Sequence, residues 1–472
     1  MRVRRTLFWL GLAISLIPRN CLADGDAVTR FTLSQAIDFA LAHHPSIRSQ
    51  RALEEGSIAG IEQARTAYMP DIEVSQMVDR AAQSHNPPGL YLPMPGFPAS
   101  EGSRNTGSFG SSEWNSGTSI FIDENVSGLI RQMRLVDAAL AKREQAAAGV
   151  AAQRLLVSYG AADAFLAEVA AQQTVRATRA GVERARAFAT AVHGLVASGM
   201  RPGADESRAQ AELAVARNQE IAAEQNEQVA EATLADALGI TSDQRVEIVD
   251  SQQFQALPQI PSSTSIALGN PFLREFAAGI KSSQRLEQAA RYEYLPRLDV
   301  VAGLFGRGTG LSFGGAVPGA GSGVLPNSFN WATGVVFTIP IQQLFAARAD
   351  VHAAAANIRL AKAQYGETAL QIDDQIASAR AMLTGSERIA VNMPLELAAA
   401  RATWTQNNAR YSAGLMTVLD VADAERLLTQ AEVDNAVARV NVWRAMLLVS
   451  RAAGDLEPFF TIARNAVAGG QH

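Results

Sequence analysis

The chain has 472 residues, of which 48% are hydrophobic and 18% are charged, and its formal net charge is −5. This acidic balance argues against nucleic acid as a partner. The single cysteine, Cys21, lies near the N-terminus, so the remainder of the chain can form neither disulfides nor cysteine metal sites.

Residues 1–23 are expected to be a secretory signal peptide. Three arginines among the first five residues precede an apolar run at 6–18, and small residues around Ala23 suit cleavage. The run is too short to span ~30 Å of hydrocarbon as an anchor. Because no later segment resembles a spanning helix of ~20 apolar residues, a membrane-embedded form of this protein would have to use β-strands.

The chain after residue 23 contains two copies of one pattern, 24–239 and 266–454, joined by residues 240–265 and followed by a tail at 455–472. Each copy opens with a helix that begins at one proline and ends before another. The prolines recur after 226 residues, and the glycines that end the later helices recur after 215. Such agreement predicts an internal tandem repeat. The matched pairs are Pro45 and Pro271, Pro70 and Pro296, Gly199 and Gly414, and Gly239 and Gly454.

A β-hairpin is expected next in each copy, at about 71–123 and 297–340. Hydrophobic and polar residues alternate on both sides of a segment rich in glycine, proline and serine, which is typical of two strands and their connection. Each chain therefore supplies four strands. The turn-rich connections, at 84–112 and 306–327, would lie on the cell surface if the hairpins cross a membrane.

A long alanine-rich helical hairpin follows in each copy, at about 126–239 and 341–454. Its first helix has about 70 residues and would extend roughly 105 Å. Pro394 lies inside the second of these helices and should kink or break it. Gly199 and Gly414 mark the reversals into the return helices.

Alanine recurs at strict seven-residue spacing along both return helices. This repeat predicts a left-handed supercoil whose seam faces a partner helix. An ordinary antiparallel bundle and the wall of a tunnel both satisfy the pattern. The positions are Ala209, Ala216, Ala223, Ala230 and Ala237 in the first copy, and Ala424, Ala431, Ala438, Ala445 and Ala452 in the second.

Four alternating strands cannot close on themselves in lipid, where unpaired backbone groups cost several kcal/mol each. The smallest spanning barrels use about eight strands, so at least two chains would be required, and three would supply twelve strands. A soluble periplasmic sheet is the alternative. Aromatic residues near the strand ends fit either an interfacial girdle or a packed hairpin: Tyr68, Trp114, Phe121, Tyr294, Phe305, Phe329 and Trp331.

Three elements of the sequence resemble the TolC family of outer-membrane efflux proteins. They are the opening segment 31–47, which contains His44-Pro45, the paired junctions Tyr68-Met69-Pro70 and Tyr294-Leu295-Pro296, and the segment 410–424. The last reads Arg410-Tyr411-Ser412-Ala413-Gly414 and continues to Leu419-Asp420-Val421-Ala422-Asp423-Ala424.

The resemblance implies a mainly helical subunit with a small β part. It implies a homotrimer with a twelve-stranded transmembrane β-barrel and a coiled-coil α-helical tunnel in the periplasm. Residues 240–265 and the C-terminal tail would form an equatorial region outside the tunnel. The implied location is the outer membrane of a Gram-negative bacterium.

The implied function is a passive exit duct of a tripartite efflux or type I secretion system, without cofactors or catalysis. Its partners would be outer-membrane lipid, a periplasmic adaptor and an inner-membrane pump. No phosphate-binding loop, zinc-protease motif or nucleophile elbow occurs in the sequence. A periplasmic coiled-coil adaptor or structural protein is the alternative, although it would not need two hairpins at equivalent points of a repeat.

In the family, the tunnel narrows where the helices reverse. Carried over by position, the resemblance places Asp205, Tyr411, Asp420 and Asp423 at this periplasmic gate, beside the reversals at Gly199 and Gly414. Pro70 and Pro296 correspond to the helix–strand junctions.

The basic residue that the family pattern expects two positions after Gly414 is Met416 here, whereas Arg201 occupies the equivalent position after Gly199. We therefore expect Arg201 to supply the closing ion pair, and rings of acid to favour cations in the lumen. The alternative is that Arg201 and the aspartates are solvated caps of helix ends.

Overall fold

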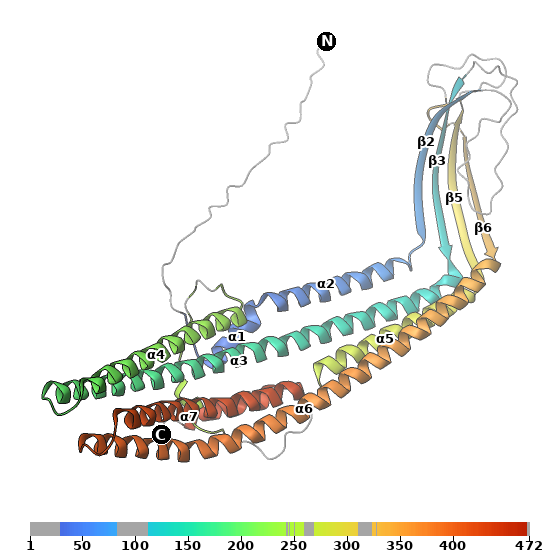
Figure 1. The fold of residues 1–472 in the computed structure, drawn as a ribbon. Coiled ribbons are helices and arrows are strands. Elements are labelled where there is room, and N and C mark those ends of the chain that lie inside the picture. Colours follow the sequence, from blue (N-terminus) through green and yellow to red (C-terminus); the bar gives the residue numbers. More distant parts are fainter. Residues whose placement is uncertain are drawn as a thin grey trace, which may run out of the picture.

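The computed structural model describes residues 29–82, 112–258, 269–309 and 323–469, apart from 242, 243, 245, 250 and 327. A four-stranded sheet lies at one end of the molecule, and two long helical hairpins reverse at the other (Figure 1). The expected signal peptide, most of both turn-rich connections and the end of the tail lie outside the described residues.

The first copy consists of a short helical segment, a strand pair and a long helical hairpin. Its elements are β1 (Thr29–Phe31), α1 (Leu33–His43), α2 (Pro45–Thr66), β2 (Asp71–Ala82), β3 (Ser112–Asn125), α3 (Leu129–Ala197) and α4 (Gly203–Leu238). A 3-10 turn at Val126–Gly128 connects β3 to α3.

The second copy repeats this order after a short connection that contains β4 (Val246–Ile248) and a 3-10 turn at Ser251–Gln255. Its elements are α5 (Pro271–Arg291), β5 (Arg297–Thr309), β6 (Ser328–Thr338), α6 (Ile341–Ser412) and α7 (Val418–Ala453). A further helix, α8 (Glu457–Gly469), follows the repeat.

The prolines fix where the repeated elements begin. Pro45 and Pro271 lie in the first turns of α2 and α5, where a missing backbone N–H costs nothing and the fixed φ suits a helix. Their predecessors, His44 and Asn270, cap these helices by accepting a hydrogen bond from a backbone N–H two residues on. Pro70 ends the turn before β2, and Pro296 precedes β5.

The strands form one antiparallel sheet in the order β2-β3-β5-β6, as the sequence predicted for each hairpin. The register places many of the apolar residues of the four strands on one face, with Val74 opposite Ile120, Ile120 opposite Leu304, and Leu304 opposite Trp331. Large side chains on this face are exposed to solvent in the single chain: Ile72, Val74, Ile120, Ile122, Val300, Leu304, Phe329, Trp331, Val335 and Phe337.

Both edges of the sheet are open in the single chain. β2 and β6 lie at the two ends of the strand order, and each is longer than ten residues. Long open edges are templates for pairing with another chain. Within the described part of the chain, no helix is long and apolar enough to cross a membrane.

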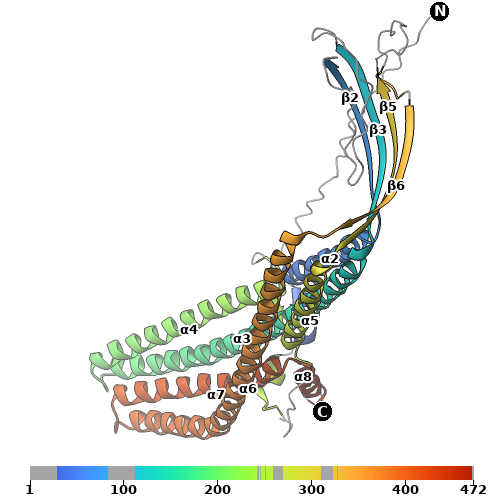
Figure 2. The same cartoon turned by 90° about the vertical axis from the view of Figure 1, so that its right-hand side faces the viewer.

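The helices pack as two hairpins, α3 with α4 and α6 with α7, and α3 also packs along α7 (Figures 1 and 2). The break considered for the second long helix at Pro394 does not occur, because α6 runs without interruption for 72 residues. Proline's fixed φ is compatible with a helix, and buried alanines on both sides, Ala390 and Ala400, hold this segment against its neighbours.

The largest core lies midway along the helices, where α1, α8 and the short parallel pair of β1 and β4 surround the hairpins. Trp443 at its centre is fully buried and contacts Phe254 and Phe459 edge to face. The indole N–H donates to the carbonyl oxygen of Ala256 at 2.9 Å. These contacts join the connection between the copies and the C-terminal helix to α7.

Candidate functional site

The two helix reversals have the same geometry. Gly199 and Gly414 adopt φ values of +73° and +81°, a left-handed conformation that favours glycine. At each reversal the N–H of the following residue returns to a carbonyl five residues back, from Met200 to Leu195 and from Leu415 to Arg410, both at 2.9 Å. This is the Schellman pattern of helix termination.

Tyr411 connects the two reversals. Its side chain is 2% exposed in a small apolar cluster with Val192, Ala209, Val418 and Val421, and its ring meets Phe188 edge to face at 5.2 Å. The cluster draws side chains from both hairpins, so it holds their ends together.

Arg201 lies on Tyr411 rather than on a carboxylate. The guanidinium carbon is 4.5 Å from the centre of the Tyr411 ring, and Nη2 donates to the Tyr411 carbonyl oxygen at 3.0 Å. No ion pair of Arg201 occurs among the residues that the structure describes. A cation over an aromatic face is attracted by the ring, by about 0.5–1 kcal/mol at exposed sites.

Asp205 lies in the first turn of α4, where a negative charge is favourable. Burial raises the pKa of Tyr411, the charge of Asp205 raises it further, and Arg201 lowers it. The structure thus brings three of the predicted site residues together within one chain.

The other two predicted acids have local partners. Asp420 forms a capping box with Thr417 at the start of α7, and the Thr417 hydrogen bonds hold the pKa of this carboxyl below its usual range. Asp423 pairs with Arg426 one turn away. Within one chain Asp420 therefore acts as a helix cap, which was the alternative to a gate residue. A gate role for Asp420 and Asp423 stays a prediction.

A second charged cluster, absent from the predicted site, lies farther along the hairpins. Arg184 of α3 contacts Glu425 at 2.7 Å and Glu432 at 2.9 Å, and it donates to the Thr429 hydroxyl at 3.0 Å. The three charged side chains are only 14–19% exposed. We call Arg184, Glu425, Thr429 and Glu432 the Arg184 pin, because they join α3 to α7.

The helices approach closely beside this pin. A Cβ atom added to Gly181 would lie 2.8 Å from the Thr429 hydroxyl, closer than any side chain tolerates. Glu425 and Glu432 are seven residues apart and adjoin the alanine seam at Ala424 and Ala431. Two glutamates at this spacing indicate a basic residue on the facing helix. The sequence does not identify that residue, because Arg184 lies more than 240 positions before Glu425.

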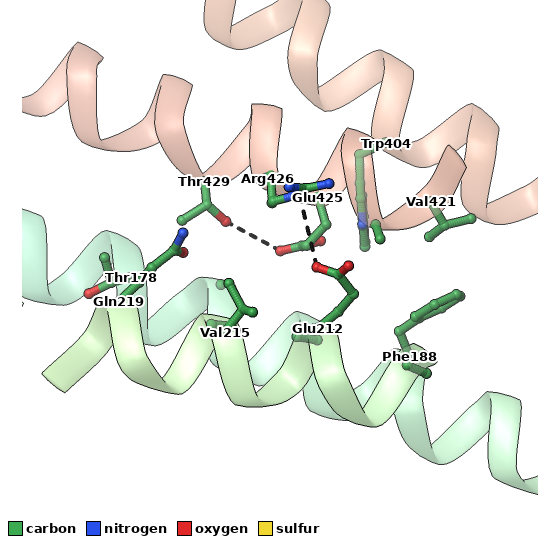
Figure 3. Close-up of a pocket in the computed structure, with 15 residues that line it drawn as sticks. Thr178, Phe188, Glu212, Val215, Gln219, Trp404, Val421, Glu425, Arg426 and Thr429 are labelled. Atoms are coloured by element: carbon green, nitrogen blue, oxygen red, sulfur yellow. Dashed lines mark hydrogen bonds and ion pairs between the residues drawn. The ribbon is translucent and has the colours of Figure 1, made fainter. Parts of the chain in front are cut away.

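A narrow cavity of about 30 Å³ opens between the hairpins at this level. Figure 3 shows Glu212 of α4 paired with Arg426 of α7 across it, Thr429 bonded to Glu425 along α7, and Trp404 and Phe188 at one end. Its size suits a water molecule and is far below that of small-molecule sites. No cluster of three or more metal-binding side chains occurs in the described parts of the chain.

Comparison with known families gives a match that covers most of the chain. The model of the family described as "Outer membrane efflux protein" matches residues 36–240 and 264–455. The two matched segments coincide closely with the two copies of the repeat. No protein of curated function matches this sequence.

Several solved structures share the fold along nearly the whole chain. The outer membrane protein VceC of Vibrio cholerae is 16% identical with a TM-score of 0.72, over 90% of this chain and 96% of that one. The CmeC outer membrane channel of Campylobacter jejuni is 18% identical with a TM-score of 0.75, over 92% and 89%. The MtrE outer membrane channel of Neisseria gonorrhoeae is 17% identical with a TM-score of 0.70, over 90% and 89%.

Proposed function

The chain belongs to the outer membrane efflux protein family, and from this premise we propose that three copies form one passive exit duct. The protein is an outer-membrane efflux channel that extends into the periplasm. The adaptor alternative raised by the long helices is therefore wrong. Three sheets of four strands would make a closed barrel of twelve, and the helical hairpins would line up as a tunnel below it.

The sheet supports closure by other copies. It combines two open edges with an apolar face that the single chain leaves exposed. In lipid, that face is favourable and the edges are not, since each unpaired backbone group costs several kcal/mol. Pairing β6 of one copy with β2 of the next would satisfy both edges of every sheet.

The return helices support the same assembly. All five seam alanines of α7 are buried, whereas of the five in α4 two are buried, Ala209 and Ala223. The difference arises because α7 packs between α3 and α6, whereas α4 packs chiefly on α3. A neighbouring copy whose α6 lay along α4 would give α4 a second partner helix, as α3 and α6 already do for α7.

An exit duct of this kind needs an energy source elsewhere, since the chain carries no nucleotide-binding motif. We propose a periplasmic adaptor and an inner-membrane pump as partners, in an efflux or type I secretion system. The helix reversals would be the contact point for the adaptor because they lie farthest from the sheet (Figure 1).

We propose that Arg201, Asp205, Tyr411, Asp420 and Asp423 form the periplasmic gate. The contact of Arg201 with Tyr411 supports this assignment, because it crosses between the hairpins at their ends. In the assembled duct Arg201 supplies the closing ion pair to acids at the tip, and acids repeated around the axis favour cations in the lumen.

Single-channel recording in planar bilayers tests the gate. Arg201→Ala and Asp205→Asn should each raise the conductance of the closed state. Arg186→Ala serves as the control, since this exposed residue pairs with Glu183 on its own helix. Unchanged closure in both gate variants would refute the assignment. Absence of any conductance from the unmodified protein would refute the duct itself.

A further inference from the structure

The helices that adjoin the sheet leave one outer helix on each side of the chain. They lie in the order α2, α3, α5, α6 (Figure 1), which matches the order of the strands to which they connect. In the proposed trimer, on which this inference rests, β6 of one copy pairs with β2 of the next. The same ring therefore brings α6 of one copy against α2 of the next copy.

The internal repeat supplies a register for this meeting of α2 and α6. α5 follows its equivalent α2 by 226 residues, and α6 follows its equivalent α3 by 215. Within one chain α5 packs on α3, and we call this the in-chain contact. Its equivalent is the packing of α2 on α6 of the next copy, which we call the between-copy contact. Each pair of facing residues in the in-chain contact therefore predicts a pair in the between-copy contact.

One such pair is apolar. A Cβ atom added to Gly279 of α5 would lie 3.3 Å from Nε2 of Gln145 on α3, so these two positions face each other. Their equivalents are Leu53 and Leu360. In the single chain these leucines are 62% and 56% exposed, and burying both in the between-copy contact is favourable.

A second pair is charged. Lys281 of α5 contacts Glu144 of α3 at 3.2 Å. The equivalent residues are Glu55 on α2 and Arg359 on α6, again of opposite charge but with the signs reversed between the two helices. Both side chains are exposed in the single chain, and neither forms an ion pair with another residue that the structure describes.

A third pair leaves room for the helices to approach. Ser282 of α5 donates to the carbonyl oxygen of Ala138 on α3 at 3.4 Å, and the equivalents are Gly56 and Ala353. A Cβ atom added to Gly56 would have nothing within 4 Å in the single chain. Glycine weakens a helix interior but permits close approach of another backbone, which the between-copy contact would supply.

We propose that Glu55 of one copy pairs with Arg359 of the next, and that the reversed signs assign α2 and α5 to different grooves. Because α2 and α5 are equivalent helices, α2 of one copy would otherwise be able to replace α5 on α3 of another. That exchange would place Glu55 against Glu144, two like charges that repel each other. It would likewise leave Lys281 to meet Arg359. Repulsion therefore opposes the wrong pairing, while attraction favours the correct one.

Charge reversal tests the pair through the temperature at which the trimer separates into single chains during heating in mild detergent. Glu55→Lys and Arg359→Glu should each lower this temperature by several degrees, because each places like charges at all three between-copy contacts. The double variant E55K/R359E should restore most of the loss, which also shows that the substituted chains fold. Arg186→Glu reverses an exposed charge near the helix reversals and should leave the temperature unchanged.

A cysteine pair at the two leucines tests whether the contact joins different copies. Oxidised L53C/L360C should run as a covalent trimer on denaturing gels and as a single chain after dithiothreitol. L53C/L370C is the matched control, because Leu370 is also exposed on α6 but lies ten residues farther along it, roughly 15 Å away. This control should stay a single chain on denaturing gels.

Three outcomes would overturn the inference while the unmodified protein is trimeric. They are separation temperatures of the single charge variants equal to that of the wild type, a double variant no more stable than the single ones, and oxidised L53C/L360C that runs only as single chains. An unmodified protein that is itself a single chain in mild detergent would instead count against the proposed trimer.

Discussion

Glu168 is a carboxyl group whose surroundings oppose ionisation. It lies in α3 and is 3% exposed, with Gln172 donating to Oε1 at 3.0 Å. Burial raises the pKa of Glu168 to about 7, the Gln172 hydrogen bond lowers it, and Glu227 and Glu231 on α4 raise it. A proton held near neutral pH makes stability depend on pH.

The sign follows from the direction of the shift. A folded-state pKa above that of the unfolded chain means that Glu168 contributes stability at low pH, and this contribution is lost as pH rises through about 7. The shift corresponds to about 3 kcal/mol. We expect the melting temperature in detergent to fall between pH 5.5 and 8.5, and Glu168→Gln to flatten this fall. The control Glu183→Gln changes an exposed carboxyl group on the same helix and should leave this fall unchanged. An unaltered pH profile in Glu168→Gln would contradict the assignment.

Arg184→Ala should be severely destabilising. The substitution leaves Glu425 and Glu432 without their shared cation between α3 and α7, where they are 14% and 19% exposed, at a cost of about 3–5 kcal/mol. Burial already raises the pKa of Glu425, and Arg184 opposes that rise. The melting temperature measures the effect.

Arg179→Ala is the matched control, since Arg179 lies on the same helix and pairs with Glu220 and Glu224 in a solvent-exposed position. Such pairs contribute little, so its melting temperature should match that of the wild type. Equal falls in melting temperature in the two variants would show that the Arg184 pin stabilises the fold no more than an exposed ion pair does.

At the scale of elements, the crossing of α3 and α7 depends on a missing side chain. Gly181→Ala should lower stability by about 1–3 kcal/mol because its Cβ meets Thr429. Gly160→Ala, on the same helix with open space around it, should raise stability by roughly 1 kcal/mol through helix propensity. Comparing the unfolding free energies of the two variants isolates the effect of the close contact. A higher unfolding free energy in both variants would contradict the prediction, because it would show that α3 and α7 can move apart freely.

The elements themselves were largely predictable from the sequence, because their signals are local. Pro45 and Pro271 begin helices, alternation after Pro70 and Pro296 gives strands, and Gly199 and Gly414 end the long helices. The effect of Pro394 was not fully predictable, since neighbouring helices hold α6 continuous through it.

The candidate site was less predictable. Tyr411, Arg201 and Asp205 were expected near one another and do converge, but the contact of Arg201 with an aromatic ring depends on how the two hairpins meet. The Arg184 pin joins residues more than 240 positions apart. No local pattern specifies which of the basic residues of α3 faces Glu425 and Glu432.

At the scale of the whole molecule, three surfaces that the single chain leaves exposed motivate the proposed assembly. The apolar sheet face, the open edges of β2 and β6, and the uncovered flank of α4 all remain available in one chain. In the proposed ring of copies, neighbouring chains would cover the edges and the α4 flank, and lipid would cover the sheet face.

Native mass spectrometry of the full-length protein, released from outer membranes in mild detergent, tests this account most directly. The account predicts particles that contain three chains in mild detergent and that dissociate only when a denaturing detergent unfolds the sheet. A stable single chain under the same conditions would contradict it, because the sheet edges and the α4 flank would then need no partner.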